Sequence, residues 1–196
     1  MTRLFRVICR FLLLACVAAC SGVETPPSEG NQGVERQNGP APALAELRLY
    51  TIVATETGTG VHTALMIETP EERLLFDPAG SYRLKTVSEK GDVLYGITPE
   101  TLEGYVDYHA REGYDVLEQR VSVTLDQARV AASLVKGNGS VPKLQCALMT
   151  SRLLKRVPGF GDVSVSYFPR RLAAFLATHP DTRERHFIGA TSEDRG

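Results

Sequence analysis

The segment from Ser21 to Ala43 limits how much of this 196-residue chain can fold. It consists mostly of Pro, Gly, Ser, Asn, Gln and Glu with two isolated valines, so it cannot bury enough apolar surface to offset the loss of chain entropy. We therefore predict a flexible tether over residues 20–45. About 140 residues follow, which is the size of one ordinary domain with its own hydrophobic core.

The chain before this segment has the organisation of a secretory signal. Three arginines without an acidic residue precede the apolar run Phe11–Ala19, which is shorter than the roughly 18 to 20 residues that span a bilayer. We expect cleavage rather than a permanent transmembrane helix. The junction Val17–Ser21 resembles the bacterial lipobox, in which small residues precede a cysteine that is acylated, for example with palmitate, and becomes the new N-terminus.

This resemblance implies that residues 1–19 are removed and that Cys20 carries the lipid. Cys16 fits the pattern loosely, but its use would leave an apolar stretch shorter than a signal needs. An ordinary signal peptide with an incidental cysteine is the alternative. Ser21 resembles an outer-membrane sorting signal, so we expect an exported protein, anchored by lipid to the periplasmic face of the outer membrane if the host has two membranes.

Charge and motif content exclude several classes of binding site. The formal net charge is −1 and becomes −4 when the three signal arginines leave, and no basic stripe is present that could attract nucleic acid. His109, His179 and His186 lack metal-ligand spacing, and neither HExxH nor CxxC occurs. The glycine pairs near Gly58 and Gly137 lack the pattern that cradles phosphate. We therefore expect no metal and no cofactor.

The apolar patterns of strands and helices are grouped along the chain rather than regularly alternating. This grouping predicts an α+β fold with a mainly antiparallel sheet packed with helices. The expected strands are 47–55, which should be central in the sheet, 61–67, 73–76, 114–123 and 163–167, and the expected helices are 99–111, 124–136 with a capping box at its start, 144–157 and 169–178. We predict a folded domain over residues 46–186 and a disordered tail over 187–196.

Cys146 is the cysteine on which a prediction of function depends. Cys9 and Cys16 leave with the signal and Cys20 takes the lipid, so Cys146 has no disulfide partner and is either a reactive thiol or a small buried residue. It falls in the first turn of an expected helix, where unpaired N–H groups and the helix dipole favour a thiolate. The same N–H groups, with Gln145 as an extra donor, could stabilise an oxyanion.

His62 is the best-placed candidate for the base that such a thiol requires. It lies near the start of an expected strand, after a glycine-containing turn, so its imidazole should stand at the edge of the sheet. A histidine of near-neutral pKa can deprotonate a thiol and then protonate the leaving group. Asp77, at the end of the next strand, could orient the second ring nitrogen, and Glu68 and His109 compete for that role.

These residues resemble the permuted papain-like, NlpC-type thiol hydrolases, including the YiiX-type and lecithin:retinol-acyltransferase-like branches. In that superfamily the histidine strand precedes a helix that begins with the nucleophilic cysteine. Residues 61–78 resemble the histidine hairpin and residues 144–154 the cysteine helix, and the likeness covers about residues 47–176. It implies a circularly permuted papain-like fold. The chain departs from many relatives in having Gln145, rather than Asn or Asp, before the cysteine.

The leading hypothesis is a lipid-anchored cell-envelope thiol hydrolase or acyltransferase with Cys146 as nucleophile, His62 as base and Asp77 as orienting group. The resemblance implies as substrate an amide bond of a peptidoglycan peptide or an acyl ester or amide of a lipid. The competing hypothesis is a non-catalytic envelope lipoprotein that uses the same fold for binding, which Gln145 favours. A third is an unrelated structural α+β domain. The expected partners are the membrane, through the lipid on Cys20, and the substrate, for a protein expected to be a monomer.

Overall fold

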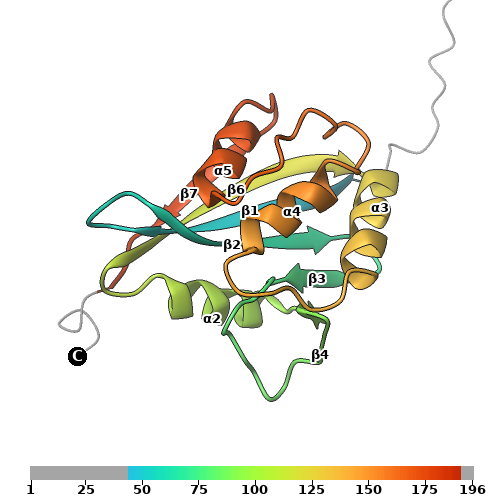
Figure 1. The fold of residues 1–196 in the computed structure, drawn as a ribbon. Helices are drawn as coiled ribbons and strands as arrows, with labels where there is room; N and C mark the ends of the chain where they lie inside the picture. The colour runs from blue at the N-terminus through green and yellow to red at the C-terminus, as the bar shows by residue number, and fades with distance from the viewer. Residues whose placement is uncertain (1–43, 191–196) are drawn as a thin grey trace, which may run out of the picture. The chain divides into compact units, whose positions relative to one another are not determined.

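A seven-stranded antiparallel sheet runs through the part of the chain that the computed structural model describes, residues 44–190 (Figure 1). Its spatial order is β4-β5-β3-β2-β1-β6-β7. The strands are β1 (Leu44–Ala54), β2 (Gly60–Glu68), β3 (Arg73–Phe76), β4 (Glu89–Lys90), β5 (Val93–Tyr95), β6 (Tyr114–Thr124) and β7 (Arg183–Phe187). The predicted signal, Cys20 and the residues after 190 lie outside the described residues.

Helices pack on both faces of this sheet (Figure 1). Within the described residues they are α2 (Pro99–His109), α3 (Leu125–Lys136), α4 (Cys146–Leu154) and α5 (Pro169–Ala177). The core on one face is formed with α3, α4 and α5, and the core on the other face with α2. This arrangement confirms the predicted α+β class with a mainly antiparallel sheet. In residues 44–190, none of the helices combines the length and apolar composition that crossing a bilayer requires.

Strand β1 is central and carries apolar side chains on both faces, as its sequence predicts. It pairs antiparallel with β2 on one side and with β6 on the other. Successive side chains of a strand point to opposite faces. Leu47 and Leu49 therefore enter the core with α3, α4 and α5, whereas Tyr50 and Ile52 enter the core with α2.

Local capping explains where two of the helices begin. At the start of α3, the N–H of Gln127 donates to Thr124 Oγ1 at 3.2 Å, and the N–H of Thr124 donates to Gln127 Oε1 at 2.8 Å. This is the predicted capping box. At the start of α2, Thr98 Oγ1 accepts from the N–H of Thr101 at 3.1 Å, and Pro99 occupies a position where no N–H is needed.

The structure corrects several predictions from the sequence. The expected strand at 163–167 is absent, because these residues form an irregular segment between α4 and α5. Strand β7 pairs with β6 and continues to Phe187, and the N–H of Gly189 donates to Asp115 Oδ1 at 2.8 Å. Residues 187–190 thus belong to the folded body rather than to a disordered tail, and β1 begins at Leu44, inside the predicted tether.

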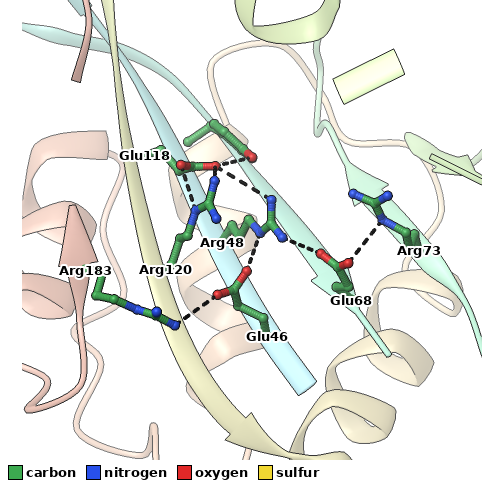
Figure 2. A network of polar contacts seen from close by, with 8 residues as sticks. Glu46, Arg48, Glu68, Arg73, Glu118, Arg120 and Arg183 are labelled. Atoms are coloured by element: carbon green, nitrogen blue, oxygen red, sulfur yellow. Dashed lines mark hydrogen bonds and ion pairs between the residues drawn. The ribbon is translucent and has the colours of Figure 1, made fainter. Parts of the chain in front are cut away.

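A network of charged side chains occupies the sheet face that α2 covers only in part (Figure 2). Arg48 forms ion pairs with Glu46 and Glu68, and its guanidinium lies 3.9 Å from Glu118. Glu118, only 2 % exposed, also accepts hydrogen bonds from Tyr50 and Arg120. A cavity of about 610 Å³ separates these groups from α2. Each charged side chain of this network therefore has a partner of opposite charge on the same sheet face.

Candidate active site

The early end of β3 leaves one edge of β2 open. Strand β3 pairs only with residues 65–68 of β2, so residues 60–64 have no strand partner on that side. Pro78 follows immediately after Asp77 and lacks the N–H that a longer ladder would need. His62 lies on this open stretch, where the first residue of α4, Cys146, interacts with it.

The structure places Asp77 against the imidazole of His62. The distance from His62 Nε2 to Asp77 Oδ1 is 2.6 Å, and Asp77 is 1 % exposed. The same carboxylate oxygen accepts a hydrogen bond of 3.0 Å from the hydroxyl of Tyr105, on α2. Asp77 thus holds one ring nitrogen and leaves Nδ1 of His62 as the nitrogen that can face a thiol.

The Cys146 thiol is unpaired, and the residue is only 6 % exposed. Burial alone would raise its pKa, but a hydrogen bond with His62 and the charge of that imidazole lower the pKa below the ordinary value. Backbone N–H groups of Thr63 and Ala147 act in the same direction. These groups therefore favour a thiolate at this position.

His62 responds to the same contacts in the opposite sense. Burial lowers its pKa, but hydrogen bonds with Asp77 and Cys146 and the charges of both groups outweigh burial and raise the pKa to about 9. The contact therefore favours an imidazolium beside a thiolate over two neutral groups. The sequence brings these residues from positions 62, 77 and 146 into one cluster.

Donors for an oxyanion are present next to the sulfur. The N–H groups of Thr63 and Ala147 interact with Cys146, and the first turn of α4 adds the positive end of a helix dipole. Gln145 lies directly before the cysteine as the N-cap residue, and its side chain makes no capping hydrogen bond. Its amide is thus not committed to the helix start.

Neither of the two alternatives, Glu68 and His109, hydrogen-bonds to the imidazole of His62. Glu68 is at the far end of β2, where it pairs with Arg48 and Arg73. His109 stacks on His62 with ring centroids 5.8 Å apart and an interplanar angle of 14°. It packs against the imidazole face, and its Nδ1 bonds to the backbone carbonyl of Tyr105 at 2.9 Å instead.

Two residues of this cluster were missed from the sequence. Tyr105 precedes His109 by four residues on α2, and this spacing predicts that both lie on one helix face. Nothing local predicts that the face meets Asp77. Gly80 lies so close to Asp77 Oδ2 that a Cβ would come within 1.8 Å of that oxygen. The Asp77-Pro78-Ala79-Gly80 turn predicted from composition therefore also makes room for the carboxylate.

Within residues 44–190, no group of three or more His, Cys, Asp or Glu side chains is arranged to hold a metal ion. His179 stacks on Phe160, and His186 lies on β7, so neither joins the cluster at His62.

None of the family models, curated proteins or solved structures with which the chain was compared matches it.

Proposed function

We propose that this protein is a thiol hydrolase or acyltransferase that cleaves an ester or amide bond. Cys146 is the nucleophile, His62 is the general acid and base, and Asp77 orients the imidazole. The observation that carries the proposal is the position of His62, which is hydrogen-bonded to a buried carboxylate and interacts with the only cysteine of residues 21–196.

The reaction follows from the charges of this pair. The Cys146 thiolate attacks the carbonyl carbon, and the oxyanion that forms is stabilised by N–H groups such as that of Ala147. The imidazolium of His62 donates its proton to the leaving alcohol or amine as the bond to the carbonyl carbon breaks, which leaves a thioester. His62 then takes a proton from water, or from an acceptor alcohol or amine, which attacks the thioester. The acyl product leaves, and the thiolate–imidazolium pair is restored.

The permuted papain-like, NlpC-type fold is part of this proposal. It is supported by the chain order, in which the histidine strand β2 precedes the cysteine helix α4, and by the place of Cys146 as the first residue of its helix. The three helices packed on the cysteine face of an antiparallel sheet are compatible with it.

We also propose that Cys20 anchors the protein to the membrane by lipid, which directs the enzyme to substrates of the cell envelope. Expression in a bacterial host with an alkyne analogue of palmitate tests the anchor. Cys20→Ser should abolish labelling and leave the signal uncleaved, whereas Cys16→Ser should retain both labelling and cleavage. Labelling that survives in Cys20→Ser would reject Cys20 as the anchor.

The activity of the thiol is tested by alkylation with iodoacetamide, quantified on the tryptic peptide Leu144–Arg152. We expect rapid labelling of native protein at pH 6, because the hydrogen bond with His62 and the charge of its imidazole lower the pKa of the Cys146 thiol. His62→Asn should slow labelling at pH 6 at least about tenfold, since an ordinary thiol with a pKa near 8.5 is less than 1 % ionised at that pH. His186→Asn, on the exposed strand β7, is the matched control and should label like the wild type.

The competing function is a binding protein that retains the fold without catalysis. The small exposure of Cys146 favours it. Labelling that requires denaturation at every pH would identify Cys146 as a packed thiol and would support this alternative.

A further inference from the structure

A small cavity shares the catalytic imidazole as part of its wall. It has a volume of about 180 Å³ and lies where His62, Ser81, Tyr108, His109, Arg111 and Tyr114 meet. A group bound in it would contact the imidazole that serves Cys146. A substrate group bound in the cavity would therefore lie beside the imidazole that acts in the proposed reaction.

Arg111 gives this cavity its charge. Its guanidinium lies 5.3 Å from the ring centroid of Tyr108 and 5.3 Å from that of Tyr114, and Nη1 donates to the carbonyl of Tyr108 at 2.8 Å. Across residues 44–190, no carboxylate forms an ion pair with it. A guanidinium has five N–H donors, so this side chain is held in place by its neighbours and still has donors to offer an anion.

His109 adds a hydrogen-bond acceptor to the cavity, and the geometry shows which of its ring nitrogens accepts. Its Nδ1 lies 2.9 Å from the carbonyl oxygen of Tyr105, which can only accept, so Nδ1 carries the hydrogen. Burial lowers the pKa of His109, which keeps the ring neutral near pH 7. Its Nε2 therefore has a free lone pair, and this is the group that His109 can present to an N–H or O–H of an occupant.

The size and the remaining lining favour a small polar occupant. Ser81 Oγ and Tyr108 Oη lie 3.1 Å apart on the wall. A volume of about 180 Å³ is below the roughly 300 to 1,000 Å³ of pockets for drug-sized ligands. A long acyl chain would exceed this space and would remove water from the charge of Arg111 without replacing it.

We propose that this cavity is a substrate subsite for a carboxylate group next to the scissile bond, with Arg111 pairing with the carboxylate and His109 accepting from a neighbouring N–H or O–H. This inference rests on the proposed function and deepens it. It assigns as substrates acidic acyl compounds or acidic peptides rather than neutral lipid acyl chains.

Two pairs of activated esters test this subsite on the full chain. The first pair, 4-nitrophenyl hydrogen glutarate and its methyl ester, has or lacks a carboxylate on the acyl side. The second pair, 4-acetoxybenzoate and its methyl ester, has or lacks it on the leaving-group side. The measured quantity is the ratio of kcat/KM for the acidic ester to kcat/KM for the neutral ester, after subtraction of the spontaneous rate and of the rate with Cys146→Ala.

We compare Arg111→Gln with Arg185→Gln, because Arg185 also stacks on an aromatic ring, 4.5 Å from the centroid of Phe187, but lies on β7. In at least one ester pair, Arg111→Gln should lower the ratio about tenfold or more, as expected for a lost charge-assisted hydrogen bond. Arg185→Gln should leave it at the wild-type value. Circular dichroism melts of both variants identify any general loss of folding.

The outcomes separate this subsite from the proposed function. Turnover that depends on Cys146, with ratios that Arg111→Gln leaves unchanged in both pairs, would overturn the subsite and leave the thiol hydrolase standing. Absence of Cys146-dependent turnover of all four esters would reject both. A preference for the neutral ester in both pairs would also overturn the subsite and would favour an apolar acyl substrate.

Discussion

Replacement of Asp77 by Asn should lower the pKa of His62 by a large and measurable amount. In the wild type this pKa is raised to about 9, and the contact with Asp77 is the first among the interactions that raise it. The difference from the ordinary value of about 6.5 corresponds to about 3 kcal/mol between the two protonation states. Asparagine keeps the shape but removes the charge, and burial then acts to lower the pKa. We expect a value at least 1.5 lower than in the wild type.

The assay is a pH titration of the His62 Cε1 proton by NMR between pH 5 and 11. At pH 8 the wild-type ring should be about 90 % protonated, and the Asp77→Asn ring less than about 25 %. Asp126→Asn is the matched control, because Asp126 is on α3 with its side chain 95 % exposed. A His62 midpoint in Asp77→Asn within 0.5 of the wild-type midpoint would refute the assigned role of the carboxylate.

Asp77→Asn should also change how the unfolding free energy of the protein depends on pH. A folded-state pKa above the unfolded value stabilises the protein fully below about pH 6.5, and the stabilisation is lost as the pH rises through about 9. The difference in unfolding free energy between wild type and Asp77→Asn should therefore decrease by up to about 3 kcal/mol between pH 6 and pH 10. Urea unfolding at a series of pH values measures it, and a difference that grows with pH would contradict the assignment.

Three further substitutions test the surroundings of this site. Gly80→Ala places a Cβ 1.8 Å from the Asp77 carboxylate, so the carboxylate must move; we expect slow iodoacetamide labelling at pH 6 and a loss of about 1 to 3 kcal/mol in urea unfolding, whereas Gly161→Ala, which meets nothing within 4 Å, should change neither. Tyr105→Phe removes one hydrogen bond to the same carboxylate, and such a bond contributes about 1 kcal/mol. We therefore expect iodoacetamide labelling of Cys146 to be roughly threefold to tenfold slower in this variant. Glu118→Ala leaves two arginines and a tyrosine hydroxyl without their buried partner and should lower the urea-unfolding free energy by about 3 kcal/mol, with labelling unchanged.

The regular parts of this fold follow from local patterns. Strand β1 could be predicted as central because apolar side chains occur on both of its faces, and the start of α3 at Thr124 could be predicted because a capping box is a local signal. The strands that were missed are β4, β5 and β7. β4 has two residues and β5 three, and β7 reads Arg-Glu-Arg-His-Phe with little apolar alternation, so its pairing with β6 is decided by tertiary contacts.

The sequence predicts which residues could form the candidate site, but it predicts less well which other residues they contact. Cys146, His62 and Asp77 could be selected because each is of a residue type with a defined role and lies at the end of an expected element. The choice of Asp77 over Glu68 depends on which end of β2 the cysteine helix meets, which no local pattern fixes. Tyr105 belongs to α2, on which the sequence shows only an ordinary helix face, so its contact with Asp77 requires the packed structure.

The open edge of β2 links the fold to the proposed chemistry. The edge of a sheet presents unpaired N–H and C=O groups with which another strand could pair. Here β3 ends at Phe76, Pro78 cannot extend the ladder, and the N–H of Thr63 interacts with the Cys146 sulfur instead. The same strand ending delivers Asp77 to the imidazole of His62. A single interruption in strand pairing thus supplies the space for the thiol, a donor beside it and the carboxylate behind the base. If the ladder continued by two residues, positions 77 and 78 would pair with Ala64 and Thr63, and the N–H of Thr63 would serve strand pairing rather than the Cys146 sulfur.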